Sequence, residues 1–479
     1  MSPWHSAYRE RVLEPDYTFA ERHLVSHFLD ALSAHVQTVG RLPYVHDQGA
    51  ISALLRALET LRSEPPLPYD PLVPDLYFAI NRWLEAALGE ATVGFLRLGL
   101  SRNDLDMTVY KLRARELLLS LGEQLCTLRG AILAQAEAHL TTVLVAHTHH
   151  QPGQPTTVAH YLAAIGSALA RDFDRLSAAF TRLNTCPLGA AALAGSSHPL
   201  DRAYTAELLG FSAPVANTYD AVAASDWQVE IVGVSQSIAL TLSRFVCDLL
   251  NWASQGVLRL GDGLVQGSSI MPQKRNPVAL EHARTRFSRV LGASQMVLYS
   301  SHNIPYADLN DFGPDIQGAL QALFLQLSGG LDLLRACVSE SRFDVAALAK
   351  LAEATDTTAT ELADELTRRG LSFQASHRLV GRLLEQLARR GEPLQRATPG
   401  DVRQLGGPDL SDADLRAALE PGVFVRRRSG LGGPAPDTMK VQLARAAQHL
   451  NENSAKLSEL QNRLHEAQSS LSAPGKERL

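Results

Sequence analysis

The feature that most limits the fold of this chain is a set of long proline-free segments with apolar residues every three or four positions. One segment runs from Thr156 to Cys186 and another from Asp226 to Ser254. The apolar positions of the first are Leu162, Ile165, Leu169, Phe173, Leu176, Phe180 and Leu183. Such spacing keeps one side of an α-helix apolar, so both segments are predicted to be amphipathic helices.

Two more helices are expected. The stretch from Asp104 to Val145 also lacks proline, which predicts one helix of about 40 residues, or ~60 Å at the standard rise. Another helix should begin at Pro277, because proline suits the first helical turn. The face of this helix is expected to carry Leu280, Ala283, Phe287, Leu291 and Ser294.

Helices of this length bury their apolar faces only against partners of similar length. The sequence therefore predicts an all-α protein with an extended central bundle over residues 105–350. Shorter helices should form an N-terminal domain over residues 1–104 and a C-terminal domain over residues 351–479. The last helix carries leucines near heptad spacing, at Leu450, Leu457, Leu460, Leu464 and Leu471. A surface helix that frays into the polar tail is favoured here over a coiled coil. The length of the bundle suggests that bundles pair between subunits.

Composition and charge exclude several classes of protein. Apolar residues make up 45% of the chain, charged residues 20%, and the formal net charge is −5. No large block of one sign occurs, which disfavours a nucleic-acid partner or an acidic membrane surface. There is no run of about 18 uninterrupted apolar residues and no signal-peptide core, so no membrane helix or secretion is expected. Four widely spaced cysteines predict neither a disulfide framework nor structural zinc, and favour the cytoplasm.

One loop gathers an unusual number of hydrogen-bonding groups, "GSSIMPQKRNP", residues 267–277. Ser268 and Ser269 supply hydroxyls, Lys274 a positive charge and Asn276 an amide. Together they suit a substrate whose carboxylate gains negative charge during reaction. Singly, Asn276 could cap the following helix, and Lys274 could be a solvated surface lysine. Their concentration in one loop stiffened by two prolines favours the functional interpretation.

A second polar cluster is "HTHHQPGQPTT", residues 147–157. Three histidines in four residues suggest metal binding, yet the segment has no HExxH pattern and no cysteine, so no metal site is expected. A histidine that transfers a proton is more plausible. His147 and His150 are interpreted as loop residues.

A third cluster is "SRND", residues 101–104, at the start of the long helix. Arg102 could grip a carboxylate with two nitrogens. Asn103 and Asp104 could equally be helix caps.

These three clusters, in this order, resemble the fumarase/aspartase superfamily and, within it, argininosuccinate lyase. The segments "PLGAAALAGSSHPLDRAYTAELLGF", "NTYDAVAASDW" and "FVRRRSGLGGPAP" are also similar to that family, so the resemblance covers about residues 75–445. It implies an all-α homotetramer with a core of about twenty long helices. Each active site would combine segments from three subunits, and no cofactor or metal would be needed. The implied reaction is a β-elimination that splits an N-substituted aspartate, a dicarboxylate, into fumarate and an amine.

The resemblance also assigns roles to residues. Ser268 would be the general base that removes the Cβ proton, while Lys274 and Asn276 would hold the oxygens of the doubly charged aci-carboxylate. His149, oriented by Glu281, would contact the leaving side. The substrate-binding set implied by the resemblance is Ser101, Arg102, Asn103, Thr148, Gln154, Ser196, Ser197, Ser269 and Tyr306.

The chain departs from the family pattern in three places. The glycine-rich opening of the GGRF type is absent, and "PDLYFAIN" has Tyr77 and Asn81 where the family has other polar residues. In "PYADLNDFGPD", Asn310 replaces a glutamine that holds the carboxylate of the arginine half. Phe312 or Gly313 falls where the family has a lysine, although Tyr306 remains.

The half of the site that makes fumarate is therefore complete, whereas the half that binds the amine is altered. Loss of the cation that faces a buried substrate carboxylate weakens binding by roughly several kcal/mol. We expect a carbon–nitrogen lyase whose amine product is not ordinary arginine. Two alternatives remain open: a genuine argininosuccinate lyase, and a non-catalytic structural or regulatory homotetramer. The presence of Ser268, Lys274, His149 and Glu281 argues against the second.

Overall fold

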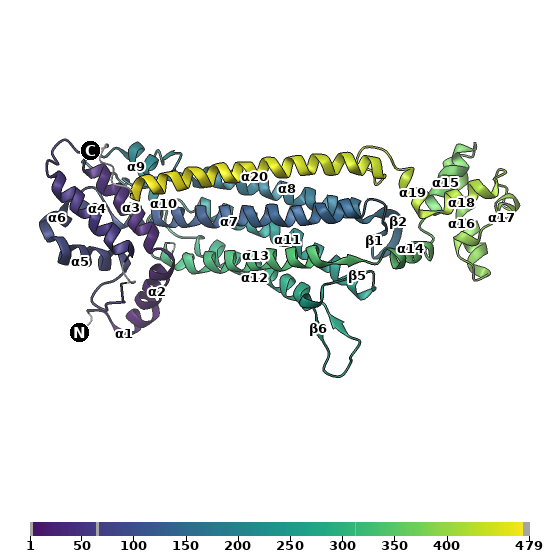
Figure 1. Cartoon of the computed structure of the whole chain (residues 1–479), viewed down its shortest axis with the longest axis horizontal. Coiled ribbons are helices and arrows are strands. Elements are labelled where there is room, and N and C mark those ends of the chain that lie inside the picture. The colour runs from purple at the N-terminus through teal and green to yellow at the C-terminus, as the bar shows by residue number, and fades with distance from the viewer. Residues whose placement is uncertain (1–2, 64–66, 312, 473–479) are drawn as a thin grey trace.

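The computed structural model describes residues 3–63, 67–311 and 313–472, and shows an elongated molecule built almost wholly of helices (Figure 1). Shorter helices lie at one end, long helices run side by side through the middle, and a second group of short helices lies at the other end. The predicted all-α architecture is confirmed.

The first end contains the N-terminal helices. Their bounds are α1 Ser6–Tyr8, the π-helical turn η1 Arg9–Leu13, α2 Glu14–His23, α3 Val25–Val39, α4 Gln48–Ser63, α5 Leu76–Leu88 and α6 Glu90–Leu96. Helix α3 contacts α4, α6 and the long helix α7, Arg102–Ala138. Many of its residues are buried, including Leu29, Leu32 and Val36. The N-terminal helices thus share one apolar cluster with the bundle.

The bundle consists of α7 and five further long helices. They are α8 Val158–Leu183, α11 Asp226–Ser254, α12 Val278–Ser300, α13 Pro314–Glu340 and α20 Pro436–Ser472. The helix predicted over residues 226–254 is confirmed at both ends. The helix expected at Pro277 begins at Val278, and Leu280, Ala283, Phe287 and Ser294 are buried while Leu291 is only partly so. Two short helices, α9 Arg202–Leu208 and α10 Thr218–Ala223, lie between α8 and α11 in the sequence.

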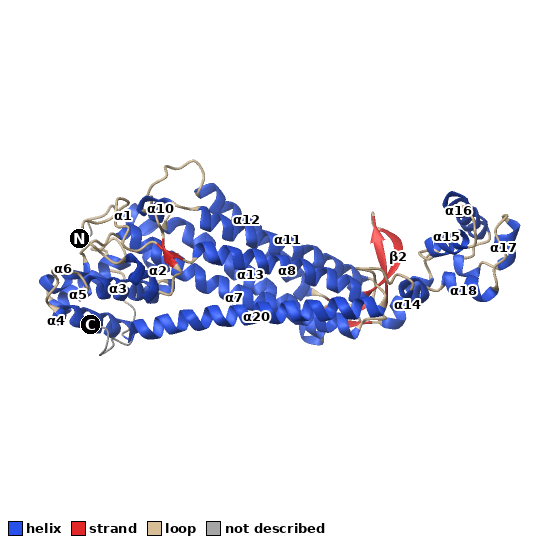
Figure 2. Cartoon of the chain, turned by 90° about the horizontal axis from the view of Figure 1, so that it is seen from above, coloured by secondary structure: helices blue, strands red, loops and turns tan. Residues whose placement is uncertain are grey.

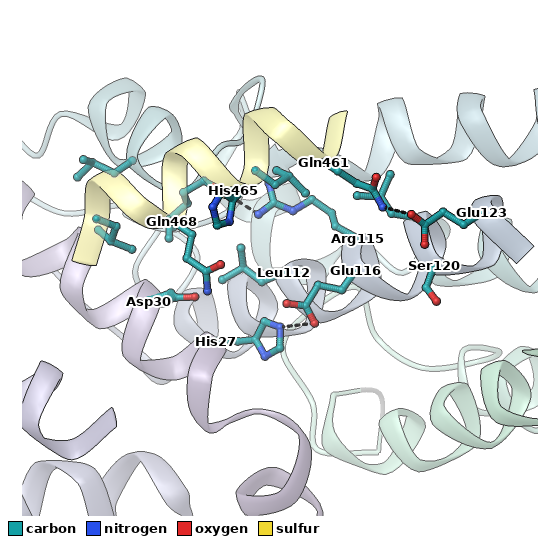
Figure 3. Close-up of a pocket in the computed structure, with 15 residues that line it drawn as sticks. His27, Asp30, Leu112, Arg115, Glu116, Ser120, Glu123, Gln461, His465 and Gln468 are labelled. Atoms are coloured by element: carbon teal, nitrogen blue, oxygen red, sulfur yellow. Dashed lines mark hydrogen bonds and ion pairs between the residues drawn. The ribbon is translucent and has the colours of Figure 1, made fainter. Parts of the chain in front are cut away.

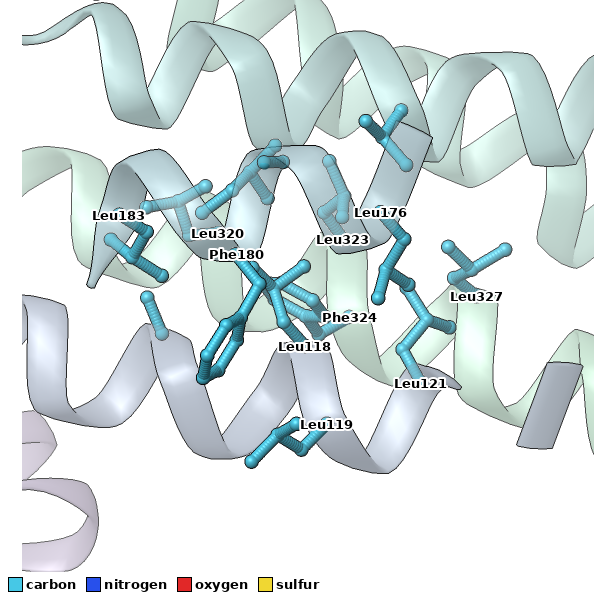
Figure 4. Packing of buried hydrophobic residues seen from close by; sticks show 14 of the residues in the cluster. Leu118, Leu119, Leu121, Leu176, Phe180, Leu183, Leu320, Leu323, Phe324 and Leu327 are labelled. Atoms are coloured by element: carbon cyan, nitrogen blue, oxygen red, sulfur yellow. The ribbon is translucent and has the colours of Figure 1, made fainter. Parts of the chain in front are cut away.

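Leucine and phenylalanine side chains fill the bundle core (Figure 4). Leu118 and Leu121 of α7 belong to the same cluster as Phe180 of α8 and Leu323 of α13, and each is almost fully buried. Burying one such side chain contributes roughly 1.5–3 kcal/mol. Packing of the apolar faces of α7, α8 and α13 therefore stabilises this part of the bundle.

The helix predicted over residues 104–145 is wrong in its last part. Helix α7 ends at Ala138, and β1, Val143–Thr148, forms an antiparallel hairpin with β2, Gln151–Thr157. The segment "LTTVLV" is rich in β-branched residues, which favour extended backbone. The hairpin partner lies further along the chain, so helical periodicity up to residue 138 gave no warning of it.

Short strand pairs fasten the remaining loops. They are β3 Thr185–Cys186 with β4 Ala213–Pro214, β5 Leu258–Arg259 with β8 Arg342–Phe343, and β6 Gln266–Gly267 with β7 Arg275–Asn276. The helical turn η2, Asp262–Leu264, precedes β6. Strands β6 and β7 carry a loop that projects away from the bundle (Figure 1).

The second end holds α14 Val345–Glu353, α15 Ala359–Arg368, α16 Phe373–Arg389, η3 Leu394–Arg396, α17 Pro399–Gln404, α18 Asp412–Leu419 and α19 Pro421–Arg426. Residues of α15 to α18 form an apolar cluster of their own, separate from the bundle core. Figure 2 shows them beyond the β1–β2 hairpin, at the end opposite the N-terminal helices.

The last helix differs from the expected surface helix. Helix α20 returns along the bundle and contacts α7 and α8 (Figures 1 and 2). Met439, Leu443, Leu457 and Leu471 are buried within the main cluster. The heptad-like leucine spacing therefore marks a packing face. The three-domain division of the chain stays a prediction.

Among the described residues, three helices are long and apolar enough by length and composition to cross a membrane: α7, α11 and α13. Between 44% and 56% of the most apolar window of each is buried inside the chain itself. Their apolar character is thus partly accounted for by the bundle core.

Candidate active site

The "SRND" cluster forms the first turn of α7. Ser101 occupies the N-cap, where its side chain accepts a hydrogen bond from the N–H of Asn103, and Asp104 accepts one from the N–H of Ser101. The second carboxylate oxygen of Asp104 accepts hydrogen bonds from the N–H groups of Gly189 at 2.8 Å and Ala191 at 2.9 Å. Burial raises the pKa of Asp104 to about 7. Asp104 is therefore a cap that also fixes the 189–191 loop.

Arg102 is held by two carboxylates of its own chain. Its Nη1 lies 2.8 Å from Asp75 and its Nε 3.1 Å from Asp106. Burial lowers the pKa of Arg102, but attraction to Asp106 and Asp75 outweighs this, so the pKa stays above its usual value. Burial raises the pKa of Asp106 to about 7 although Arg102 opposes the shift. Two nitrogens of the Arg102 guanidinium are thus already used in ion pairs within the chain, before any substrate binds.

Distant segments join the cluster at this end of α7. The amide of Asn103 donates a hydrogen bond to Asp308 at 2.8 Å. Tyr306 donates one to Asp220 at 2.5 Å, and its ring stacks on Tyr219 with centroids 6.2 Å apart. Both tyrosines are exposed. The segment that departs from the family pattern therefore lies against the predicted carboxylate-binding turn.

The serine pair 196–197 belongs to the same neighbourhood. Gly99 adopts φ +67°, and a Cβ placed there would lie 2.8 Å from Oγ of Ser196. A side chain at residue 99 would collide with the loop, so glycine allows this close approach. Ser101, Ser196 and Asn103 thus come together, while Ser197 lies beside them in sequence.

The "THHQ" segment forms the tip of the β1–β2 hairpin at the other end of α7. His149 and His150 are the two turn residues, with φ 51° and 61°, and both are exposed. Positive φ at both central positions is the geometry of a type I′ turn, which usually requires asparagine or glycine. Such backbone strain often lies at functional sites. Thr148 ends β1, and Gln154 in β2 donates to Thr360 at 3.3 Å.

The loop between β6 and β7 places Ser268 where backbone donors meet. The Oγ of Ser268 accepts hydrogen bonds from the N–H groups of Met271 at 3.1 Å and Ile270 at 3.4 Å. Arg275 anchors the loop by contacts to the carbonyl oxygen of Leu260 and to Asp262. Two N–H groups aimed at one hydroxyl oxygen would stabilise negative charge there.

The other residues of this loop face solvent. Ser269 and Lys274 are exposed, and Asn276 is half-buried. The N-cap of α12 is Pro277 without a side-chain hydrogen bond, so the alternative of Asn276 as the capping residue is wrong. Glu281 lies exposed in the first turn of α12. Lys274 and Glu281 are therefore free to meet groups from outside this chain.

One chain does not bring its three clusters together. The "SRND" turn begins α7, and the hairpin with His149 follows its far end (Figure 1). The 37 residues of α7 span about 55 Å at 1.5 Å per residue. The Ser268 loop projects separately below the bundle. The predicted residues thus fall into three separate regions of the chain: the start of α7, the β1–β2 hairpin and the β6–β7 loop.

Within residues 3–63, 67–311 and 313–472, no group of three or more histidine, cysteine or acidic side chains is arranged to hold a metal ion.

The structure adds site residues that the sequence analysis missed. They are the partners of the predicted ones: Asp75, Asp106, Asp220 and Asp308. Asp106 could have been anticipated, because it stands four residues after Arg102 on a helix. The others come from separate segments, and nothing in the sequence paired them.

Family models match most of the chain. The model described as "Lyase" covers residues 9–292, and the one described as "Argininosuccinate lyase C-terminal" covers residues 356–426. Among similar proteins, argininosuccinate lyase 2 of Agrobacterium fabrum is 35% identical over 449 residues, which cover 91% of this chain and 89% of that protein. Argininosuccinate lyase of Methanocorpusculum labreanum is 36% identical over 398 residues, or 81% of this chain and 80% of that one.

Solved structures agree with this relationship. EDDS lyase in complex with formate has a TM-score of 0.87 and 27% identity, covering 98% of this chain and 94% of its own. An EDDS lyase variant with bound fumarate gives a TM-score of 0.86 at the same identity and coverage. Class II fumarase of Schistosoma mansoni, 16% identical with a TM-score of 0.69 over 84% of this chain and 90% of its own, shares the fold. The chain therefore belongs to the argininosuccinate lyase-like branch of the fumarase/aspartase superfamily and is a fumarate-releasing carbon–nitrogen lyase.

Proposed function

We propose that the substrate is an N-substituted aspartate whose amine part is not ordinary arginine. We further propose that Ser268 starts the β-elimination. The observation that carries this mechanism is the pair of backbone N–H groups directed at the Oγ of Ser268. A serine hydroxyl is a weak base unless its anion is stabilised, and these donors, with Lys274 nearby in the loop, supply that stabilisation.

The steps follow from the charges. The Ser268 alkoxide removes a proton from Cβ, and the electron pair moves into the neighbouring carboxylate to give a doubly charged aci-carboxylate. Lys274 and Asn276 hold its oxygens. The pair then returns to form the double bond of fumarate while the C–N bond breaks. His149, oriented by Glu281, donates a proton to the nitrogen as it leaves, so that the amine departs neutral.

The substrate carboxylates are assigned to the polar residues around the start of α7 and to the hairpin. This set comprises Ser101, Arg102, Asn103, Thr148, Gln154, Ser196, Ser197, Ser269 and Tyr306. Because α7 separates two of these groups by about 55 Å, we infer that a site is completed by several copies of the chain in a homotetramer. The free position of Lys274 and Glu281 supports this assembly. A cytoplasmic location fits a metabolic enzyme of this kind.

Substrate specificity depends on the residues that would hold the amine half of the substrate. Asn310 and Gly313 stand in the segment where the family has groups that hold the arginine carboxylate; Phe312 lies outside the described residues. Residues 302–315 contain no lysine or arginine, but their sequence includes five carboxylate or amide residues: Asn303, Asp308, Asn310, Asp311 and Asp315. Asn310 also lines a small cavity together with Asp16, Asp75 and Arg102. A carboxylate-bearing amine would find little positive charge here.

Genuine argininosuccinate cleavage is the second candidate, because relatives 33–36% identical carry that name. Fumarate formation, followed by ultraviolet absorbance, separates the two. The enzyme is incubated with argininosuccinate and with N-succinyl derivatives of amines that lack a carboxylate. We expect a higher kcat/KM for one of the latter. Argininosuccinate as the best substrate would overturn the proposal on the amine, and no turnover of any N-substituted aspartate would overturn the substrate class.

A further inference from the structure

A second cavity lies away from the candidate site, between α3, α7, the end of α9 and the last turns of α20 (Figure 3). Its volume is about 310 Å³. Leucines form much of the wall, and polar groups from three helices reach into it. Gln461, Leu464, His465, Gln468 and Leu471 supply the α20 side. This part of α20 lies beyond the segments that the family models match.

Arg115 is a buried cation in the cavity wall that forms no ion pair with a carboxylate among the described residues, although Glu116 and Asp30 act on it from a distance. Its side chain is buried, with 4% exposure, and its guanidinium carbon lies 3.9 Å from the centre of the Phe211 ring. Nη1 donates to Asn184 at 2.9 Å and Nη2 to the carbonyl oxygen of Leu209 at 2.8 Å. Nε is buried and has no hydrogen-bond partner among the described residues. Burial lowers the pKa of Arg115 to about 10.

The acidic residues of the same wall each have a partner other than Arg115. Asp30 lies 2.6 Å from Arg62, and Glu116 contacts His27 at 3.1 Å and Arg113 at 3.2 Å. Glu123 accepts a hydrogen bond from Gln461 at 2.5 Å. No carboxylate of the described chain forms an ion pair with Arg115. A buried cation without an ion-pair partner is costly, so an anion bound against Arg115 would be stabilised by it, and Asp30 and Glu116 are already paired with arginine side chains.

We propose that this cavity binds a small organic anion, a carboxylate on a short hydrocarbon chain. The carboxylate lies at Arg115, and the hydrocarbon lies against Leu112, Leu208, Leu209 and Leu464. Because α20 forms one wall and α7 the opposite one, the bound anion fastens α20 to the bundle. This inference stands apart from the substrate assignment, since none of these residues belongs to the candidate active site.

Thermal unfolding of the full-length protein tests the proposal, with hexanoate as the probe and hexylamine and 1-hexanol as comparisons. A ligand that binds only the folded state raises the Tm as its concentration rises. We expect hexanoate to raise the Tm of the wild type, and hexylamine and 1-hexanol to raise it far less. A missing response to hexanoate, or an equal response to 1-hexanol, overturns the proposal.

Two α20 variants locate the effect. Gln468→Glu adds a carboxylate inside the cavity wall, whereas Asn462→Asp adds the same charge to an exposed residue of the same helix outside it. We expect the apparent Kd for hexanoate to weaken about tenfold or more in Gln468→Glu and to change little in Asn462→Asp. Equal affinity in both variants would place the anion elsewhere. Arg115→Met, if it folds, should abolish the response; Gln468→Glu decides the question if it does not.

Discussion

The side-chain amide of Asn103 donates a hydrogen bond to the carboxylate of Asp308, across 205 positions of the sequence, at 2.8 Å. This contact joins the first turn of α7 to the loop before α13. The turn is predicted to bind the fumarate-forming half of the substrate, and the loop is the segment that departs from the family. If both segments bind substrate as proposed, this hydrogen bond links the residues that recognise its two halves.

The choice of base makes the first prediction. Replacing Ser268 with alanine removes the atom that takes the proton, so kcat should fall by ~10²–10⁴. Ser268 lies in a projecting loop, so the Tm should stay near that of the wild type. Steady-state fumarate formation and thermal unfolding measure the two quantities. Ser254→Ala, at the exposed end of α11, serves as the control and should change neither. Unaltered turnover in Ser268→Ala would refute the assignment.

The second prediction concerns active sites that combine residues from different subunits. Co-expressed Ser268→Ala and His149→Ala chains should recover activity that neither variant shows alone. If a site takes the loop from one subunit and the hairpin from another, random mixing leaves about a quarter of sites intact. The fumarate assay on purified mixed oligomers measures the recovery.

A matched mixture supplies the control for shared sites. Ser268→Ala and Lys274→Ala damage the same loop, so no mixed site receives an intact loop, and this pair should stay inactive. Recovery in this second mixture, or none in the first, would contradict the shared-site arrangement.

Packing of α20 makes the third prediction. Leu457 is 4% exposed and lies over Gly122 of α7, where a Cβ would come within 2.9 Å of its methyl carbon. Leu457→Ala should lower the free energy of unfolding by about 2–5 kcal/mol, because a buried leucine leaves a cavity when truncated. Leu431→Ala, at a 97% exposed position, should change it little. Chemical denaturation compares them, and similar values for both would mean that α20 does not pack as described.

Acid stability makes the fourth prediction. The Arg390 guanidinium and the Thr398 side chain lower the pKa of Asp401 from 3.8 to about 2, although partial burial opposes them. Because the folded pKa is below the unfolded one, Asp401 stabilises the fold above about pH 4, and this contribution disappears as the pH falls towards 2.

The variant Asp401→Asn tests this linkage. It should lower the free energy of unfolding by ~1–2 kcal/mol at neutral pH and by much less at about pH 2, where the wild-type carboxylate is about half protonated in the folded state and almost fully protonated in the unfolded state. Asp409→Asn, whose partner Arg403 is well exposed, should have little effect at either pH. Unfolding measured at both pH values decides between them, and an equal loss at both would exclude the ionised carboxylate as the cause.

Sequence periodicity predicts the long helices well because each apolar face is a local property. The helix at 226–254 has the predicted ends. Residues 139–145 are predicted to be helical, but they form the turn after α7 and the start of strand β1. That error arose because strand pairing depends on residues further along the chain. For α20, the leucine pattern was visible, but no local feature showed that it would lie against α7.

The candidate site divides in the same way. The hydrogen bonds of Ser268 with Ile270 and Met271 join residues within one four-residue stretch, so they depend only on the local sequence of the loop. The pairs Arg102–Asp75, Tyr306–Asp220 and Asn103–Asp308 join separate segments, and the order of residues contains no measure of those distances. The separation of the first two clusters by a long helix, in contrast, is already implied by the helix predicted over residues 104–145, which begins beside one cluster and ends beside the other.

Helix α7 sets the distance between two segments of the candidate site. The turn that holds Arg102 and the hairpin that presents His149 are mounted at its two ends, so their spacing is fixed by how many residues lie between them. Adding or removing one helical turn would shift one mounting by about 5.4 Å relative to the other without altering a single polar side chain. Under the proposed assignment of Arg102 and His149, the length of α7 is therefore part of the geometry of the assembled site.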